Sequence, residues 1–136
     1  GAWCCWGHDN REAAVRACSP LAGREEESVN IEFKPSDASA SPHMALGAVI
    51  AAAVDGIVRT TAPPAPVAVD PAVLSDAERA EIGVEPVPRT ATEALDDLAA
   101  DDLLLGALGH YLSHSYIDDR RHERQGDGDD AADNRS

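Results

Sequence analysis

Polar side chains suited to phosphate and carboxylate groups gather in the first third of the sequence. Asn10, Arg11 and Arg16 are followed by Glu32 and Lys34. Such charged groups are costly to bury without partners. Arginine presents a planar fork of donors to oxyanions, and glutamate supplies the oxygen ligand that Mg2+ or Mn2+ prefers. The set therefore indicates phosphate and carboxylate chemistry.

A two-residue alternation positions part of this set. Apolar and polar residues alternate from residue 29 to 34, so Glu32 and Lys34 fall on one face of a predicted strand. Residues 2–6 and 13–18 predict two further strands. We therefore expect Glu32 and Lys34 to point into one open cleft, together with the two arginines.

A long apolar segment follows the polar residues. Ser41 is a suitable N-cap, and Pro42 is a suitable first residue of a helix. Beyond them apolar side chains recur at helical spacing, at Leu46, Ile50, Ala53, Val54 and Ile57. The pattern predicts a buried helix that continues to about Thr60.

Two capping-box signatures predict helices in the second half of the sequence. Ser75 with Glu78 indicates a short helix, and Thr90 with Glu93 indicates another. Asp101 is a candidate start for a further helix. Its apolar stripe would consist of Leu104, Leu108, Tyr111 and Leu112.

The sequence changes character near its end. From Asp118 onward the apolar periodicity disappears, and residues 124–136 are rich in glycine and aspartate. This composition predicts a disordered acidic tail for residues 124–136. Residues 1–123 are expected to form one modest domain.

The composition argues against several classes of protein. The net charge of −14 and the single lysine among 11 basic residues disfavour non-specific binding to nucleic acid. The longest apolar run, residues 44–58, is shorter than the roughly 20 residues of a membrane span, and no signal peptide is recognisable. Three cysteines without a CxxC spacing are expected to be free thiols in a reducing compartment, which suggests a cytoplasmic location.

The motifs, taken in order, resemble the C-terminal part of the catalytic domain of glutamine synthetases. The similar segments are Asn10-Arg11-x-x-x-x-Arg16, Glu32-x-Lys34, Ser41-Pro42-His43-x-x-Leu46, Ala53-x-Asp55-Gly56-Ile57, Leu74-Ser75-x-x-Glu78-Arg79, Pro88, Glu93-Ala94-Leu95-x-x-Leu98 and Leu108-Gly109. The resemblance covers residues 1–123. It implies an α+β fold, with short antiparallel strands at the N-terminal end followed by a mostly helical C-terminal half.

The resemblance also implies roles for the polar residues. Arg11 and Arg16 would contact the phosphates of ATP and of the γ-glutamyl phosphate intermediate. Glu32 would be one ligand of Mg2+ or Mn2+, with the other ligands upstream of this chain; an ordinary strand pairing with Lys34 is the alternative. Lys34 stands where most family members carry an arginine that grips the amino-acid substrate. Lysine keeps the charge but loses the two-pronged donor geometry.

The implied reaction is the ATP-dependent joining of ammonia, or of an amine, to the γ-carboxylate of glutamate. A γ-glutamylpolyamine synthetase is the alternative within the enzyme class, because Lys34 and the segment from Trp6 to Ala13 look more like the divergent γ-glutamylamine branch. A non-catalytic interaction module is the alternative from another class. The family builds rings of identical subunits in which a neighbouring subunit completes the active site, so this chain alone is expected to be inactive.

Overall fold

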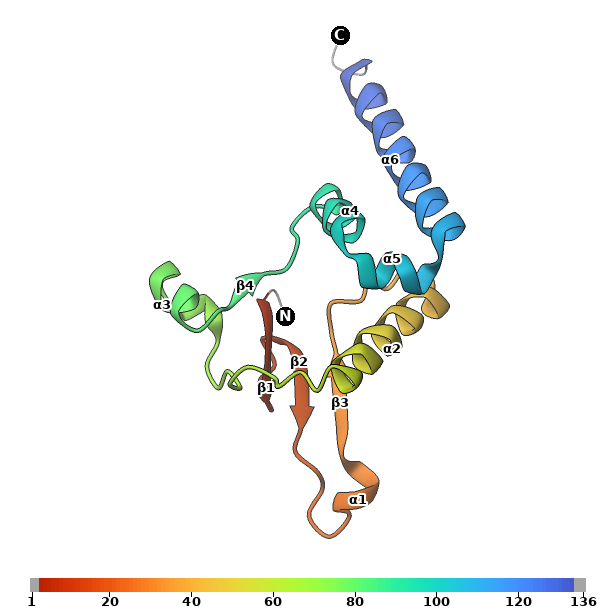
Figure 1. Ribbon diagram of the computed structural model, residues 1–136. Coiled ribbons are helices and arrows are strands. Elements are labelled where there is room, and N and C mark those ends of the chain that lie inside the picture. Colours follow the sequence, from red (N-terminus) through yellow and green to blue (C-terminus); the bar gives the residue numbers. More distant parts are fainter. Residues whose placement is uncertain (1–2, 134–136) are drawn as a thin grey trace. The chain divides into compact units, whose positions relative to one another are not determined.

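The chain forms a small sheet and several helices (Figure 1), and its residues divide into two compact units. The computed structural model describes residues 3–133. Gly1–Ala40 and Ala62–Val87 make up the sheet unit, and Ser41–Thr61 and Pro88–Ser136 make up the helical unit. Within residues 3–133 no helix combines the length and apolar character needed to cross a bilayer.

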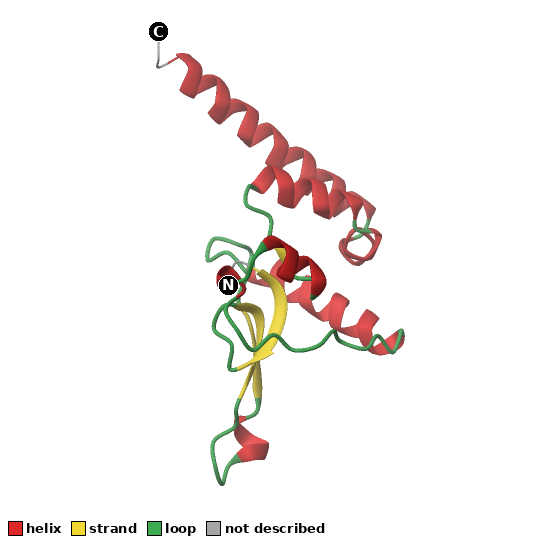
Figure 2. Ribbon diagram, turned by 90° about the vertical axis from the view of Figure 1, so that its left-hand side faces the viewer, coloured by secondary structure: helices red, strands yellow, loops and turns green. Residues whose placement is uncertain are grey.

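The strands of the sheet unit, drawn in yellow in Figure 2, pair in the order β3-β2-β1-β4. They are β1 (Trp3–His8), β2 (Ala13–Cys18), β3 (Asn30–Phe33) and β4 (Glu85–Pro86). The pairs β2–β3 and β1–β4 are antiparallel, whereas β1 and β2 run parallel. The predicted α+β class is confirmed, and the sheet is mixed rather than antiparallel throughout.

The parallel strands β1 and β2 are joined by an unusually short connection. Parallel neighbours usually need a crossover of a dozen or more residues. Here residues 9–12 carry the chain from the end of β1 back to the start of β2. Asp9 adopts a left-handed backbone conformation, with φ of 52°, where the chain reverses. An apolar–polar alternation cannot reveal this direction, because it reads the same in parallel and antiparallel strands.

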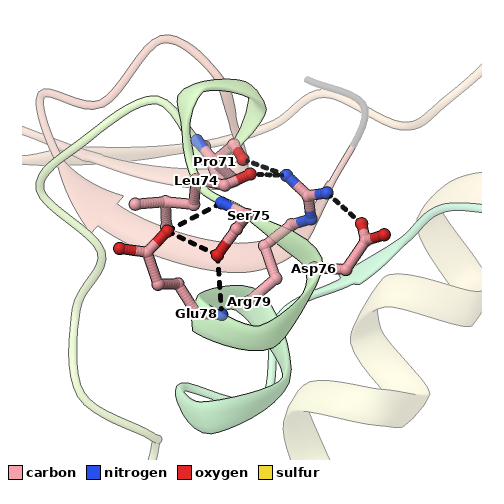
Figure 3. Close-up of polar contacts among 6 residues, drawn as sticks. All are labelled: Pro71, Leu74, Ser75, Asp76, Glu78 and Arg79. Atoms are coloured by element: carbon pink, nitrogen blue, oxygen red, sulfur yellow. Dashed lines mark hydrogen bonds and ion pairs between the residues drawn. The ribbon is translucent and has the colours of Figure 1, made fainter.

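Short helical elements complete the sheet unit. They are α1 (Glu25–Ser28), the 3-10 turn η1 (Pro71–Val73) and α3 (Asp76–Glu81). The predicted capping box begins α3: the Glu78 amide donates to Ser75 Oγ at 3.3 Å, and the Ser75 amide donates to the Glu78 carboxylate at 2.8 Å (Figure 3). These bonds satisfy donors that the first turn of a helix leaves unpaired.

The helical unit consists of α2 (Pro42–Val58), α4 (Ala91–Ala100), α5 (Asp102–Leu108) and α6 (His110–Asp133). The predicted capping box at the start of α4 is confirmed. The apolar stripe expected to form one helix is divided between α5 and α6, because Gly109 takes a φ of 77° that ends α5.

The core of the helical unit is small. Leu95 of α4 is 7% exposed and Ile117 of α6 is 6% exposed. The backbone of α6 extends to Asp133, into the segment 124–136 that the sequence predicts to be a disordered tail, and its side chains are described only as far as Glu123. The domain boundary near residue 123 stays a prediction.

The expectation that α2 is buried is wrong. Its bounds match the predicted helix, but none of its residues is buried. Ile50 and Val54 are about half exposed, and Ile57 is 78% exposed. An apolar stripe indicates that one face of a helix is suited to burial, but it does not identify the surface that buries it. Among the described residues only α5 makes extensive contact with α2.

Candidate functional site

Arg16 and Glu32 form the centre of the candidate site. They are directly opposite each other in the β2–β3 ladder, so their side chains emerge on the same face of the sheet. Arg16 Nη2 donates to Glu32 Oε1 at 2.7 Å. The sequence leaves open a pairing of Glu32 with Lys34; the structure pairs Glu32 with Arg16 instead, because the cross-strand neighbour is nearer than the residue two positions along the same strand.

The Arg16 guanidinium is only partly satisfied. Its side chain is 20% exposed, and its Nε atom is buried without a hydrogen-bond partner among the described residues. The adjacent Cys18 side chain, followed by Glu32, raises the pKa of Arg16 above its usual value. Arg16 is therefore a permanently charged donor in which one guanidinium nitrogen has no hydrogen-bond partner among the described residues.

Lys34 continues the same face beyond the end of β3. Its amide donates to the Ala14 carbonyl at 2.9 Å, which extends the ladder by one step. The alternation of strand side chains places Lys34 on the same side as Glu32. Its ammonium donates to the Asn10 carbonyl at 3.3 Å and also to the Arg11 carbonyl. The charge of Lys34 is thus directed at the backbone of the loop that carries Arg11.

Arg11 is linked to Lys34 through its backbone. Its carbonyl accepts from Lys34, and its side chain is exposed. Among the described residues no hydrogen bond or ion pair holds the Arg11 guanidinium. The structure thus brings Arg16, Glu32 and Lys34 onto one face and places the Arg11 backbone beside them; the binding roles of all four stay predictions.

Asn10 is the most strongly anchored polar residue nearby, and sequence reasoning gave it no role. It is 9% exposed. Its Nδ2 donates to the carbonyls of Val67 at 2.8 Å and Val69 at 3.0 Å, while its Oδ1 accepts from the Glu12 amide at 3.0 Å. A signal was available, because a buried amide requires hydrogen-bond partners, but the sequence cannot say where those partners lie.

The segment that receives Asn10 lies close to β1. We call residues 62–70 the crossing segment. Trp6 Nε1 donates to the Pro64 carbonyl at 2.7 Å, and the Val67 amide donates to the Trp6 carbonyl at 2.8 Å. A Cβ atom on Gly7 would lie 2.2 Å from the Val67 carbonyl oxygen, so only glycine permits this approach.

Asp9 and Ser19 stabilise the start of the loop between β1 and β2, which also carries Asn10 and Arg11. The Ser19 amide donates to Asp9 Oδ1 at 2.9 Å, and the Ser19 hydroxyl donates to Asp9 Oδ2. These bonds favour the ionised carboxylate, and the pKa of Asp9 is consequently below its ordinary value. They also compensate for the left-handed conformation of Asp9.

Arg79 joins α3 to the sheet. Its guanidinium donates to the carbonyls of Pro71 and Leu74 and to the Asp76 carboxylate (Figure 3). The same group lies 4.7 Å from the centre of the Trp3 ring, a cation–π distance. Arg79 therefore has a structural role in this unit, which its place in a family motif did not reveal.

The described residues do not by themselves make a metal site. They contain no group of three or more histidine, cysteine, aspartate or glutamate side chains placed to hold a metal ion. Glu32 could supply one carboxylate, of which Oε1 already accepts from Arg16. A hard divalent cation needs about six oxygen ligands, so the predicted metal role of Glu32 depends on ligands from outside this set.

Comparison with known proteins defines the class of this fold and site. Residues 1–128 match the family model described as the glutamine synthetase catalytic domain. A solved structure described as a novel glutamine synthase homolog superimposes with a TM-score of 0.70 at 33% identity, covering 91% of this chain and 26% of that one. The chain therefore belongs to the glutamine synthetase family and corresponds to part of its catalytic domain.

Individual relatives come from more than one branch of this family. A Streptomyces coelicolor protein named gamma-glutamylpolyamine synthetase GlnA3 is 38% identical over 117 residues, which are 86% of this chain and 25% of that protein. A glutamine synthetase of Archaeoglobus fulgidus is 32% identical over 84% of this chain and 23% of its own length. The chain thus spans about a quarter of the length of these relatives.

Proposed function

We propose that this chain is part of a longer enzyme that joins ammonia or an amine to the γ-carboxylate of glutamate with ATP, through γ-glutamyl phosphate. Membership of the glutamine synthetase family supports a ligase-type function. The observation that carries the proposal is the Arg16–Glu32 ion pair on the same sheet face as Lys34, whose ammonium contacts the backbone of Arg11. This face combines an anion-binding fork, a carboxylate and an ammonium.

In this proposal the two arginines act on phosphoryl oxygens. The bond to Glu32 fixes the plane of the Arg16 guanidinium, so that its remaining donors keep one direction without further ordering. The Arg11 side chain is exposed and available to a ligand. Charge spread over phosphoryl oxygens during transfer suits arginine, and a well-placed arginine accelerates such reactions by roughly 10³–10⁵-fold.

Glu32 and Lys34 would divide the remaining work. When Mg2+ or Mn2+ is bound, it would neutralise charge on the ATP phosphates, and Glu32 would be one of its protein ligands. Lys34 would bind a carboxylate of the amino-acid substrate. An ammonium is a compact point charge with three donors, so Lys34 has a donor left for a carboxylate besides those that reach the Asn10 and Arg11 carbonyls.

The acceptor could be a polyamine rather than ammonia. The Streptomyces coelicolor relative carries the name of a γ-glutamylpolyamine synthetase, and its 38% identity supports this alternative. The Archaeoglobus fulgidus relative, at 32% identity, supports glutamine synthetase itself. As further parts of the proposal, the longer enzyme is cytoplasmic and forms a ring of identical subunits, so that a neighbouring subunit completes the site and the chain alone is inactive.

The test is ATP-dependent phosphate release by the longer protein that contains this chain. Glutamate is supplied with ammonia, methylamine or putrescine in turn. Release with at least one acceptor supports a ligase, and the preferred acceptor identifies the branch. A folded protein that releases no phosphate with any acceptor contradicts the enzyme and favours a non-catalytic interaction module.

Substitutions then separate the roles of individual residues. Glu32→Ala should lower phosphate release by about 10³-fold or more, since it removes both a metal ligand and the partner of Arg16. Glu27→Ala is the matched control, because Glu27 is an exposed glutamate paired with Arg24 in α1. Lys34→Arg should leave ATP use intact and change the preference among substrates. An undiminished rate in Glu32→Ala at ordinary magnesium concentration would remove the proposed metal role.

A further inference from the structure

The loop that carries Arg11 is held by contacts that the proposed chemistry does not use. We call residues 9–12, between β1 and β2, the Arg11 loop. The Arg11 side chain is exposed, so its position in a complex depends on where the loop holds its backbone. A shift of about 1 Å in a catalytic group can cost roughly 10²-fold in rate. The residues that fix this backbone therefore matter as much as the arginine itself.

Asn10 fixes the loop by using both ends of its side-chain amide. Its two donors reach the Val67 and Val69 carbonyls of the crossing segment, and its acceptor receives the Glu12 amide. All of these partners are backbone groups, so the contacts specify geometry without depending on other side chains. Because Asn10 is 9% exposed, water cannot easily replace a lost bond, and each unpaired group would carry a desolvation cost.

Lys34 holds the same loop from the end of β3. Its ammonium donates to the carbonyls of Asn10 and Arg11, while Asn10 holds the amide of Glu12. Backbone groups of three consecutive residues, with Arg11 in the middle, are therefore engaged by two side chains. One side chain belongs to the loop itself, and the other comes from the end of β3.

We propose that Asn10 is a positioning residue for Arg11 and that Lys34 shares this role. The hydrogen bonds of Asn10 fix the Arg11 loop relative to the crossing segment, and those of Lys34 fix it relative to β3. The inference rests on the proposed function in so far as Arg11 acts on the reacting phosphate. It adds a second role to Lys34, whose ammonium is otherwise assigned only to the amino-acid substrate.

Kinetics of the longer protein provide the first test. Asn10→Ala should lower kcat by about 10²-fold with little change in KM for ATP, because Arg11 acts mainly on the transition state. Asn30→Ala is the matched control: Asn30 is an exposed asparagine of β3 whose amide donates to the Ser28 carbonyl at 2.9 Å. This control should keep the parental kcat. A parental kcat in folded Asn10→Ala overturns the inference.

Hydrogen exchange provides a readout that does not depend on activity. The Glu12 amide donates to Asn10 Oδ1, so Asn10→Ala should accelerate its exchange, while the Asp9 amide, which donates to the Ala17 carbonyl at 3.0 Å, should keep its protection. Unchanged exchange at Glu12 overturns the inference. If the parental protein releases no phosphate, the proposed function fails, and the exchange result alone decides whether Asn10 fixes the loop.

Two further variants keep the test decisive. Asn10→Asp retains the acceptor for the Glu12 amide and loses both donors. It is used in place of Asn10→Ala if the alanine variant does not fold. A parental kcat in folded Asn10→Asp overturns the link to the crossing segment. Lys34→Met removes the other contact. If both residues hold one loop, the combined loss in Asn10→Ala/Lys34→Met is smaller than the product of the single losses. Independent losses overturn the shared role.

Discussion

The sheet unit and the helical unit maintain their structures in different ways. In the sheet unit, side chains bond to backbone groups far away in sequence, as Asn10 does with Val67, 57 positions on. In the helical unit, the ends of helices are fixed by neighbours, as Thr90 is by the amide of Glu93, three positions on. Distant bonds determine how segments are arranged, whereas local caps determine only where a helix starts. Polar contacts thus carry the arrangement of the sheet unit.

The difference teaches where this chain depends on other surfaces. The sheet unit fixes the Arg11 loop with its own residues. The helical unit leaves the apolar face of α2 exposed, with Ile57 at 78% and Val54 at 52%. Apolar area of this kind is usually covered in a functional protein. Substitutions at matched residue types in the two units should therefore have different effects.

Glycine to alanine should give the largest contrast. Gly7→Ala places a Cβ atom 2.2 Å from the Val67 carbonyl oxygen and should destabilise the sheet unit by about 3 kcal/mol. Gly56→Ala, in α2, meets no atom within 4 Å and should stabilise its helix by about 0.5–1 kcal/mol. Urea unfolding measures both, with tryptophan fluorescence reporting the sheet unit and circular dichroism the helices. Equal effects would contradict the comparison.

Arginine to alanine should give a smaller contrast. Arg79→Ala removes hydrogen bonds to two carbonyls and the contact with the Trp3 ring, and should cost about 2 kcal/mol. Arg59→Ala removes only an exposed ion pair with Asp55 in the last turns of α2, worth about 0.5 kcal/mol or less. The difference between the two unfolding free energies is the decisive measurement. A cost for Arg59→Ala equal to that of Arg79→Ala would show that local pairs matter more than we infer.

A polar substitution on α2 should test whether its apolar face is covered elsewhere. In this chain alone, Ile57→Gln should change the unfolding free energy by less than about 0.5 kcal/mol and reduce self-association, measured by analytical ultracentrifugation. In the longer protein the same change should cost about 1.5 kcal/mol or more, because a covered isoleucine loses buried apolar area. Identical effects in the two proteins would mean that the face stays exposed in both.

Acid should weaken the Arg11 loop slightly. The Ser19 bonds lower the pKa of Asp9 in the folded protein, so the stabilising contribution is complete above the unfolded pKa of about 4. It is lost as the pH falls through the lower, folded value. Exchange of the Ser19 amide, which donates to Asp9, should therefore accelerate relative to other amides in that acidic range. Asp9→Asn should abolish this pH dependence; its persistence would point to another group.

Local features of the fold could be predicted from the sequence. Capping boxes depend on residues three positions apart, so Ser75 with Glu78 and Thr90 with Glu93 identify the starts of α3 and α4. The alternation at residues 29–34 identifies β3 because it also depends only on neighbouring residues. The ordered motifs identify the family, because they record spacing along the whole chain.

Features that depend on distant partners could not be predicted. The partner of Glu32 proved to be Arg16, 16 positions earlier, because strand register rather than sequence separation brings them together. The anchoring role of Asn10 depends on Val67 and Val69, and a buried asparagine looks the same in sequence wherever its acceptors lie. The exposure of α2 likewise depends on which surface meets it, and its own residues do not contain that information.

The position of Lys34 has a consequence for chemical labelling. Lys34 is the only lysine in the sequence, so its ammonium is the only side-chain amine that an acylating reagent can modify. In the folded chain that nitrogen donates hydrogen bonds to the Asn10 and Arg11 carbonyls, and these contacts must break before a reagent can attack it. The rate of acylation at this one atom therefore reports how often Lys34 releases the Arg11 loop, and mass analysis of the peptide that contains residue 34 distinguishes it from acylation of a terminal amine.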